Sequence, residues 1–368
     1  MIPRLYESTE TAFSTFGICP LSDAISCTVT EERNGQYTLK MEYPTNGMWY
    51  DEIKVDRIIL AQAHESDAQT QPFRIETISG DMGGVVTIGA VHVSYQLNWI
   101  ILTKMAKYTR YAEQAMVQMK RDALTVPDSC PFDFYSDIGT AESTPVYVGT
   151  TQATPFRTYL GGMEGSVLDT YGGEYEWDRW NVHLWKARGK DNGVRITYGK
   201  NLTGLDWDTD VSDTYTSVVA FWKQEQNGNI TYVSSTLQSV GANTFAFQRT
   251  IAVDATSEYQ SAPTSAQLDN YARSYIKANA LAPTVSVKAD FVPLWQTEEY
   301  KEYADFERVG LCDTVTIVYP PLNLELEAKV VKTVYNVLLD RYDSIEINTM
   351  KKTLADTIFA MQKEIRNR

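Results

Sequence analysis

The sequence is poor in the residues that hold metals and build disulfide frameworks. Its 368 residues include only 3 histidines and 4 cysteines. The cysteines show no CxxC spacing, and the histidines stand apart from them in the chain. We therefore expect no metal and no other cofactor, and interpret the cysteines as buried thiols of a protein made in a reducing cytosol. The residues concerned are Cys19, Cys27, Cys130, Cys312, His64, His92 and His183.

Recognisable catalytic motifs are also missing. His64-Glu65 lacks the second histidine that a zinc protease helix carries one turn later. The chain has no GxSxG nucleophile elbow, no GxxxxGKS/T phosphate loop and no GxGxxG that opens a helix. The sequence therefore predicts that this chain is not an enzyme, and it assigns no catalytic, cofactor-binding or metal-binding residue.

Long apolar runs and an excess of positive charge are absent as well. The most apolar stretch, Leu97–Leu102, is far shorter than the roughly 18 residues of a membrane-spanning helix, and the N-terminus has no signal-peptide pattern. With 33 basic against 47 acidic residues the net charge is -14, which argues against a general nucleic-acid binder. We expect a soluble protein without a membrane-spanning segment.

Residues 1–104 carry the pattern of a small β-barrel or sandwich. Runs of alternating or β-branched residues are separated by turn signals, of which Asn34-Gly35 is a good hairpin signal. Regular short strands at this spacing are typical of such β domains. The predicted strands are Ala24–Thr30, Gln36–Tyr43, Arg57–Ala63, Phe73–Ser79 and Val85–Val93.

From residue 105 the pattern changes to helices mixed with strands. Tyr111–Leu124 has apolar residues at helical spacing, and Met163–Tyr171 is predicted to be a short helix that ends at Gly172-Gly173. The segment 160–205 is dense in glycine, aromatic and charged residues, but its glycines stand where turns need them. We interpret it as folding and binding rather than catalytic. Its predicted strands are Tyr175–Trp177, Asn181–Lys186 and Val194–Tyr198.

The rest of the chain is again rich in strands, with one clear internal helix. Ser265–Ala280 places apolar residues such as Leu268 and Ala272 on one face, and we expect Thr264 or Ser265 to cap it. The predicted strands are Ser217–Lys223, Ile230–Ser234, Thr284–Phe291, Thr314–Val318, Glu325–Asn336 and Ser344–Ile347.

The last predicted helix, Met350–Asn367, carries an apolar seam. Leu354, Ile358, Met361 and Ile365 repeat with a 4-3-4 spacing on an otherwise polar helix, as in a coiled coil. The seam either docks on the protein's own body or mediates self-association about a symmetry axis. The spacing does not decide between the two, and we assign oligomerisation to these residues as a hypothesis.

Two carboxylates could belong to a sugar-cleaving site. Glu174 and Glu176 stand beside Trp177, Trp180 and Trp185, a composition found in sugar clefts. However, residues two apart on a strand share one face, where aromatic neighbours suit cross-strand packing. We therefore favour a structural interpretation of both carboxylates.

The acidic stretch from Asp206 to Asp210 opens like a calcium-binding loop. An EF-hand would need glycine where Val211 stands and a bidentate glutamate where Ser217 stands. An acidic surface loop is therefore the preferred interpretation.

Segments spread over nearly the whole chain carry a family resemblance. They are MIPRLYESTETAFSTFG, LSDAISCTVTEERNGQYTLKMEYP, FRI with the strand that follows it, VHVSYQL, LGGMEGSVLDTYGGEYEWDRWNVHLWKARGKDNGVRITYGKNLTGL, VGLCDTVTIVY and AKVVKTVYNVLLDRYDSIEI. Together they resemble the tail-tip hub proteins of siphophages and prophages of Gram-positive bacteria, also called prophage tail endopeptidases or tail-associated lysins. The long middle block is the most specific part. The family's usual Gly-Asp turn is Cys312-Asp313 here, which places a stricter conformational demand on that turn.

The resemblance implies an α+β, mostly β fold, similar to the baseplate hub of contractile-tailed phages. Two small β-barrels would carry inserted α/β domains and a C-terminal helix. The implied domains are 1–104 (first β-barrel tube domain), 105–195 (inserted α/β domain), 196–245 (start of the second β-barrel), 246–283 (helical insertion), 284–349 (rest of the second β-barrel) and 350–368 (C-terminal helix).

The resemblance also implies a structural role at the tail tip of a virion, after synthesis in the host bacterial cytoplasm. A homotrimer would form a ring continuous with the tail tube, bind the distal tail protein ring and contact the tape-measure protein. Phage DNA would pass through without specific binding. Receptor-binding proteins and host cell-wall polysaccharide are further implied partners.

Two other functions stay open beside this role. In family members that cut peptidoglycan the catalytic part resembles a C-terminal extension, so we expect any lytic activity there rather than in this chain. The first alternative is a peptidoglycan hydrolase that uses carboxylates near Glu174 and Trp180. The second is a cell-wall carbohydrate-binding module that acts through tryptophan and tyrosine faces.

Overall fold

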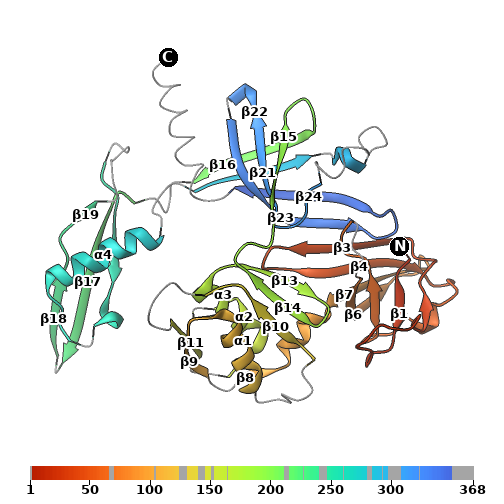
Figure 1. Cartoon of the computed structure of the whole chain (residues 1–368), viewed down its shortest axis with the longest axis horizontal. Coiled ribbons are helices and arrows are strands. Elements are labelled where there is room, and N and C mark those ends of the chain that lie inside the picture. The colour runs from red at the N-terminus through yellow and green to blue at the C-terminus, as the bar shows by residue number, and fades with distance from the viewer. Residues whose placement is uncertain are drawn as a thin grey trace. The chain divides into compact units, whose positions relative to one another are not determined.

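The computed structural model divides the chain into two compact units, each described here by itself (Figure 1). The first comprises Met1–Gly204, Ala289–Pro320 and Ala328–Asn348, and the second comprises Leu205–Lys288, Pro321–Glu327 and Thr349–Arg368. The structure describes residues 2–65, 70–102, 105–123, 131–139, 146–150, 153–163, 165–210, 215–226, 228–239, 247–259, 261–279, 284–291, 293–296, 308–322 and 324–349.

The N-terminal part of the first unit is an antiparallel sheet of the order β2-β1-β5-β6-β7-β4-β3. In β3 and β4 every second residue is buried, so one face of the pair, with Val29 and Leu39, forms core. Asn34 in the turn between them adopts a φ of 55°, as the hairpin signal predicts. The strands are β1 (Arg4–Tyr6), β2 (Cys19–Pro20), β3 (Ser26–Glu32), β4 (Tyr37–Pro44), β5 (Ile58–Ala61), β6 (Gln71–Gly80) and β7 (Val85–His92).

A second group of strands comes from the later part of the chain, in the order β15-β22-β23-β24-β21-β16. The pair β15–β22 is parallel, and the boundary between the two units falls within β16, β21, β23 and β24. The core positions of these strands include Val315, Ile317 and Val330, all at most 1% exposed. The strands are β15 (Asp191–Thr197), β16 (Leu202–Asp210), β21 (Thr284–Phe291), β22 (Thr314–Tyr319), β23 (Leu324–Asn336) and β24 (Arg341–Thr349).

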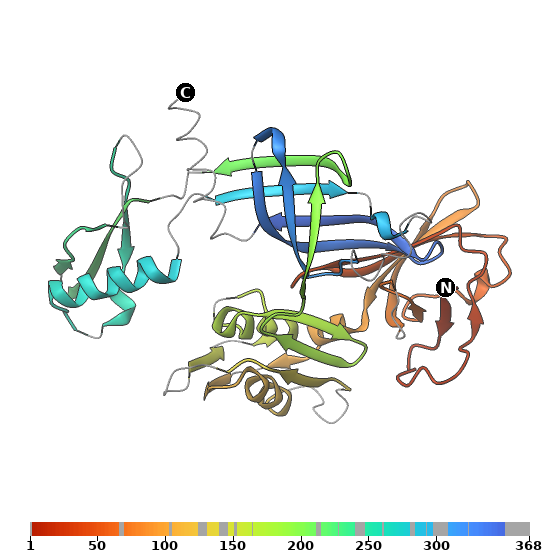
Figure 2. The same cartoon turned by 45° about the horizontal axis from the view of Figure 1, so that its top comes forward.

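The two strand groups join into one sheet because β3 pairs with β23. Val29 lies opposite Tyr335 and Glu31 opposite Thr333 in antiparallel register. Figures 1 and 2 show β3 and β23, from opposite ends of the chain, side by side. The resulting sheet has 13 strands. The mostly β fold predicted from the sequence is therefore confirmed, with strands of both predicted barrels in one continuous sheet.

An α/β segment lies between β7 and β15 in the first unit. Its three-stranded sheet has the order β10-β14-β13, and Phe134 of β10 stacks on Phe156 of α2 with ring centroids 5.2 Å apart. Two pairs of short strands, β8–β12 and β9–β11, complete the segment. Its elements are β8 (Ile101–Leu102), β9 (Met105–Thr109), α1 (Ala112–Arg121), β10 (Asp133–Ser136), β11 (Val146–Thr150), β12 (Thr154–Pro155), α2 (Phe156–Leu160), α3 (Val167–Tyr171), β13 (Glu174–Asp178) and β14 (Asn181–Trp185).

Two of the three helices of this segment follow the sequence signals, with one difference in their bounds, whereas α2 was not predicted. The helix predicted at 111–124 is α1, which buries Ala112, Ala115, Met116 and Met119. Helix α3 begins at Val167 rather than Met163, because Gly162 and Gly165 take positive φ and Ser166 caps the helix by accepting a hydrogen bond from the Asp169 N–H. It ends at Gly172, with a φ of 68°, as predicted.

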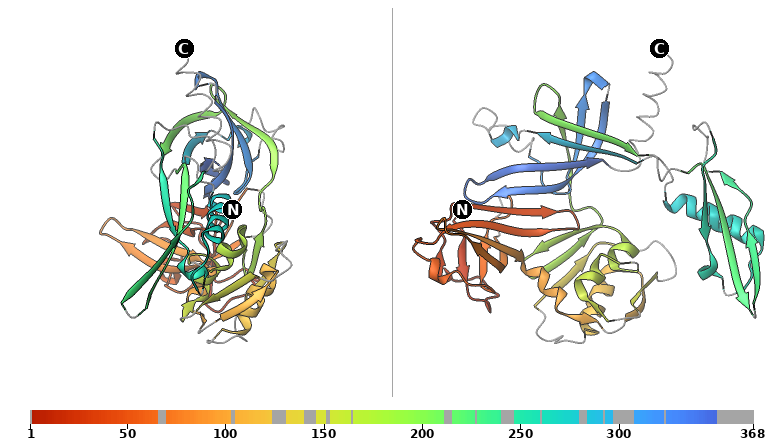
Figure 3. Two further views of the ribbon diagram at one scale, coloured as in Figure 1. Left: turned by 90° about the vertical axis from the view of Figure 1, so that its left-hand side faces the viewer. Right: turned by 180° about the vertical axis from the view of Figure 1, so that it is seen from behind.

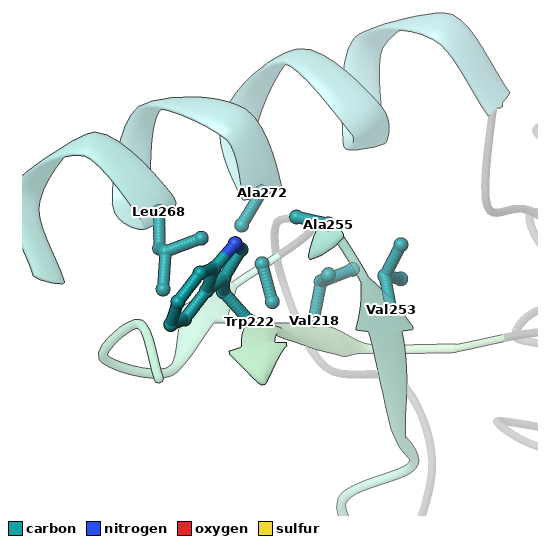
Figure 4. Packing of buried hydrophobic residues seen from close by; sticks show 7 residues of the cluster. Val218, Trp222, Val253, Ala255, Leu268 and Ala272 are labelled. Atoms are coloured by element: carbon teal, nitrogen blue, oxygen red, sulfur yellow. The ribbon is translucent and has the colours of Figure 1, made fainter. Parts of the chain in front are cut away.

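The second unit contains a small sheet covered on one face by helix α4 (Figures 3 and 4). The central strand β17 pairs with β18 and β19 in antiparallel and β20 in parallel fashion. Trp222 of β17 is 2% exposed and packs with Val218, Leu268 and Ala272 in the core between sheet and helix (Figure 4). Its elements are β17 (Ser217–Gln226), β18 (Asn229–Ser234), β19 (Gln238–Ser239), β20 (Thr250–Asp254) and α4 (Ser265–Asn279).

Thr264 caps helix α4. Its hydroxyl accepts a hydrogen bond from the Gln267 N–H at 3.3 Å, while the Gln267 side chain accepts from the Thr264 N–H at 2.8 Å. This reciprocal pair is a capping box and confirms the predicted start of the helix. Short 3-10 helices elsewhere in the chain are η1 (Tyr50–Glu52), η2 (Val93–Asn98), η4 (Thr256–Glu258), η5 (Leu294–Gln296) and η7 (Pro320–Leu322).

The structure also tests the predictions for the acidic stretch 206–210 and for the cysteines. The acidic stretch from Asp206 to Asp210 is part of strand β16 and not a surface loop, because its residues continue the extended backbone of the sheet. Cys19, Cys27 and Cys312 are buried free thiols as predicted, whereas Cys130 lies outside the described residues. Within the described part of the chain, no helix has the length and apolar character needed to cross a bilayer.

Candidate functional site

A buried group of charged side chains lies in the first unit, where β3, β13, β23 and the segment before β15 come together. Its two carboxylates, Glu31 and Glu174, are each 2% exposed, and charged groups are rarely buried so far unless they are paired. Three cations and a histidine surround them. We call the six residues the charged cluster: Glu31, Arg33, His64, Glu174, Arg188 and Lys329.

Glu31 is held by a forked contact with Arg188. Nη1 of Arg188 lies 2.6 Å from one carboxylate oxygen and Nη2 lies 3.4 Å from the other. The second oxygen also lies 2.9 Å from Nε2 of His64. Burial by itself would raise the pKa of Glu31, but Arg188 and His64 outweigh it and lower the pKa to about 2. The carboxylate is therefore ionised across the neutral pH range.

Glu174 is held from three sides. One oxygen lies 2.9 Å from Nε of Arg33 and 2.5 Å from Nζ of Lys329, and the other accepts the Arg188 N–H at 2.8 Å. Burial raises the pKa of Glu174, but the contacts to Lys329, the Arg188 backbone and Arg33 lower it further than burial raises it. A general acid in glycoside cleavage needs a raised pKa, so this carboxylate does not fit that role.

The charged cluster ties together segments that are distant in the sequence. Arg188 contacts Glu31 of β3 through its side chain and Glu174 of β13 through its backbone, while Lys329 of β23 reaches the same Glu174. Breaking a buried pair of this kind leaves an uncompensated charge, which is strongly destabilising. The charged cluster therefore stabilises the contact between the N-terminal sheet, the α/β segment and the C-terminal strands.

Next to Arg188 two backbone segments approach each other closely, which holds the charged cluster in position. A Cβ on Gly189 would lie 2.0 Å from the carbonyl oxygen of Cys312, so only glycine fits there. The Asp313 side chain accepts the N–H groups of Lys190 and Gly310, both at 2.7 Å. Cys312 has a φ of 71°, a conformation that favours glycine, in line with the family's usual Gly-Asp turn.

A polar cleft of about 550 Å³ lies beside the charged cluster. Carboxylates line it, but each has a partner within the chain. Glu176 accepts a hydrogen bond from Trp185 Nε1 at 2.6 Å, and Asp178 accepts one from Gln71 Nε2 at 2.9 Å. The cleft thus supplies charge and hydrogen bonds from carboxylates that are already partnered.

The tryptophans of the suspected sugar cleft are engaged in packing. Trp180 donates its Nε1–H to the Thr11 carbonyl at 2.8 Å and packs edge-on against Phe132. Trp177 is 7% exposed. Glu174 lies opposite Trp185 in the β13–β14 pair, as the cross-strand interpretation predicts. These rings therefore do not form an open platform for a sugar. Across the described residues, no three His, Cys, Asp or Glu side chains are placed to hold a metal ion.

Comparison with known proteins connects this architecture to phage tails. Residues 190–358 match the family model described as prophage endopeptidase tail. Prophage tail protein gp18 from Listeria monocytogenes shares the fold over 100% of both chains, with 15% identity and a TM-score of 0.59. The 43 kDa tail protein of prophage MuSo2 from Shewanella oneidensis matches 95% of this chain and 98% of its own, with 10% identity and a TM-score of 0.58. The tail protein from Neisseria meningitidis matches 96% and 97%, with 9% identity and a TM-score of 0.55. A search of curated proteins finds no significant match.

The family match and the shared fold agree with the resemblance carried by the sequence segments. Residues 190–358 are thus similar to the prophage tail family, and the whole chain has the fold of prophage tail proteins. Within this fold the segment 160–205 contributes Glu174 and Arg188 to the charged cluster. Its density of charge and glycine therefore has a structural explanation, as we interpreted from the sequence.

The sequence predicted part of the candidate site and missed other residues of it. The predicted oligomerisation residues Leu354, Ile358, Met361 and Ile365 lie outside the described residues. Arg188 and Lys329 were not singled out, because nothing local marks a lysine or arginine that will be buried.

Proposed function

We propose that the tail protein is a structural hub at the tail tip of the virion. It forms a homotrimeric ring that closes the tail tube and links it to the parts that recognise or penetrate the host cell wall during adsorption and DNA delivery. The observation that carries this proposal is the fold shared with prophage tail proteins over 95–100% of this chain. The protein would be made in the host bacterial cytoplasm and assembled into the tail.

A trimer with the seam of the last predicted helix at its axis is the central part of this proposal. We expect light scattering of the full chain to give three times the chain mass of 41.6 kDa. Replacing Leu354, Ile358, Met361 and Ile365 together by asparagine should lower the mass to that of a monomer, because a polar seam cannot pack. Gln362→Ala on the same predicted helix is the matched control and should leave the mass unchanged. A full chain that stays monomeric or forms dimers at all concentrations contradicts the proposal.

The proposed partners follow from this place in the tail. The ring would bind the distal tail protein ring on one side, contact the tape-measure protein within, and carry receptor-binding proteins or meet host cell-wall polysaccharide on the other. With a net charge of -14, the ring would let phage DNA pass without holding it, since like charges repel. We expect no DNA binding in a mobility-shift assay at physiological salt, and a salt-dependent complex would contradict this part.

The enzymatic alternative has a direct test. We expect the isolated chain not to clear a peptidoglycan suspension, because Glu174 is paired with cations and Glu176 accepts the Trp185 N–H. Glu176→Gln is the variant to compare, since Glu176 lies at the cleft and outside the charged cluster. Clearing by the native chain that Glu176→Gln abolishes would show that this chain is a hydrolase.

A further inference from the structure

A smaller cavity of about 220 Å³ lies in the first unit, between the β3–β4 turn, η2 and the α/β segment. Its lining is mostly apolar or aromatic, with Leu160, Leu168, Tyr95 and Trp177. One charged group, Arg157 of α2, is part of this lining. The exposed turn residue Asn34 lies at its border. The cavity contains no residue of the charged cluster and shares only Trp177 with the lining of the polar cleft.

Arg157 is a half-buried cation whose contacts with the described residues are to uncharged groups. Its guanidinium carbon lies 4.0 Å from the ring centroid of Tyr95 and 4.5 Å from that of Trp177. Nη1 donates to Ser94 Oγ at 2.8 Å, and Nη2 lies 3.5 Å from the Gly35 carbonyl. Burial lowers the pKa of Arg157, an effect that Tyr95 and Tyr175 offset in part.

The contrast with Arg188 shows what Arg157 lacks. Both side chains belong to the first unit, but Arg188 forms a forked pair with the buried carboxylate of Glu31. Among the described residues, no carboxylate forms such a pair with Arg157. A half-buried cation without a counter-charge gains more from an arriving anion than a fully exposed one, because less water competes for it.

We propose that this cavity binds the carboxylate of a small acid, with Arg157 as the group that receives it. A guanidinium has five N–H donors, and the bonds to Ser94, Gly35 and Tyr95 engage at most three of them. Because the rings of Tyr95 and Trp177 stack over the guanidinium carbon, the N–H edge is the side left for a ligand. A planar carboxylate with two oxygens matches that edge in a forked geometry.

The size and lining of the cavity limit the ligand further. At 220 Å³ it is smaller than the roughly 300–1,000 Å³ of pockets that enclose whole drug-sized ligands, so it takes a small molecule or the end of a longer chain. Leu160 and Leu168 suit a short aliphatic stem behind the carboxylate. A free short-chain acid and the C-terminal residue of a peptide present the same chemistry.

Saturation-transfer NMR on the full-length protein tests the proposal without requiring tight binding. The probes are butyrate and butyramide at constant ionic strength, and a peptide Gly-Gly-Val with a free or an amidated C-terminus. We expect a saturable signal for at least one of the two carboxylates and none for the matching amide. The probe that binds identifies the source, free acid or peptide end. Equal signals from acid and amide, or no signal from either carboxylate, overturn the proposal.

Two variants assign the signal to the cavity. Arg157→Met should weaken carboxylate binding roughly tenfold or more, because the charge-assisted hydrogen bonds are lost. Leu168→Trp fills the cavity while it keeps Arg157, and should abolish binding even if Arg157→Met does not fold. Leu339→Ala, at an exposed leucine of the β23–β24 turn, is the control and should bind like the native protein. Native-like binding by Leu168→Trp places the carboxylate elsewhere and refutes the site.

Discussion

Replacing Arg188 by glutamine should destabilise the first unit by about 3–5 kcal/mol. The side chain forms the forked contact with Glu31, which is 2% exposed. Its removal leaves a buried carboxylate that, within the described part of the chain, keeps an ion-pair contact with His64 alone. The backbone N–H of residue 188 still donates to Glu174, so the loss is specific to the side chain.

Hydrogen exchange read by mass spectrometry in increasing urea measures this change for each unit separately. We expect peptides of β3, β13 and β23 to lose protection at lower urea in Arg188→Gln, while peptides of β17 and α4 in the second unit keep theirs. Arg341→Gln is the matched control, because its contact with Asp343 at 4.0 Å is exposed and worth at most about 1 kcal/mol. A loss of less than about 1 kcal/mol in the unfolding free energy of Arg188→Gln would refute the view that the charged cluster stabilises the contact between these segments.

The same pair predicts the response to acid. The pKa of Glu31 is about 2 in the folded protein, against an ordinary value of 4.5. Its stabilising contribution of about 3 kcal/mol is therefore fully present above pH 4.5 and is lost as the pH falls towards 2. Urea unfolding between pH 6 and pH 3 should show this loss in the native protein and a smaller one in Arg188→Gln. Equal pH dependence in the two proteins would contradict the assignment.

Three further substitutions test other parts of the fold. Gly189→Ala should cost roughly 3 kcal/mol or more in urea unfolding of the first unit, because its Cβ would meet the Cys312 carbonyl at 2.0 Å; a neutral effect would mean that the two segments can move apart. Thr264→Ala should lower the stability of the second unit by about 1 kcal/mol, because the helix cap is lost, whereas Thr264→Ser should keep most of that stability. Unchanged protection of α4 from exchange in Thr264→Ala would count against the capping box. Trp222→Ala should cost about 3–5 kcal/mol and expose α4 to exchange while the first unit stays protected; simultaneous loss in both units would contradict their independence.

Local signals were sufficient for many elements of the fold. The alternation in β3 and β4, the turn at Asn34 and the capping box at Thr264 are properties of neighbouring residues, and the structure has them where the sequence placed them. Strand β20 was missed in the region predicted as a helical insertion. It is only 5 residues long and is supported by parallel pairing with β17, a contact that no local pattern reveals.

The charged cluster and the Arg157 cavity could not be predicted for the same reason. Arg188 and Glu31 are 157 positions apart, and Lys329 and Glu174 are 155 apart. An arginine that will be buried beside tyrosine and tryptophan rings has the same local sequence pattern as one on the surface. The sequence did indicate that catalytic motifs are absent. Glu174 is paired with the cations Arg33 and Lys329, which gives this carboxylate a structural role that needs no catalytic motif.

Immuno-electron microscopy of phage particles that carry this protein tests the central claim most directly. Antibodies raised against the second unit, Leu205–Lys288, would be applied to intact particles and to isolated tails. The account predicts gold label only at the end of the tail that is distal to the head. Label along the whole tail, label on the capsid, or no label on particles that contain the protein by mass spectrometry would contradict a place at the tail tip.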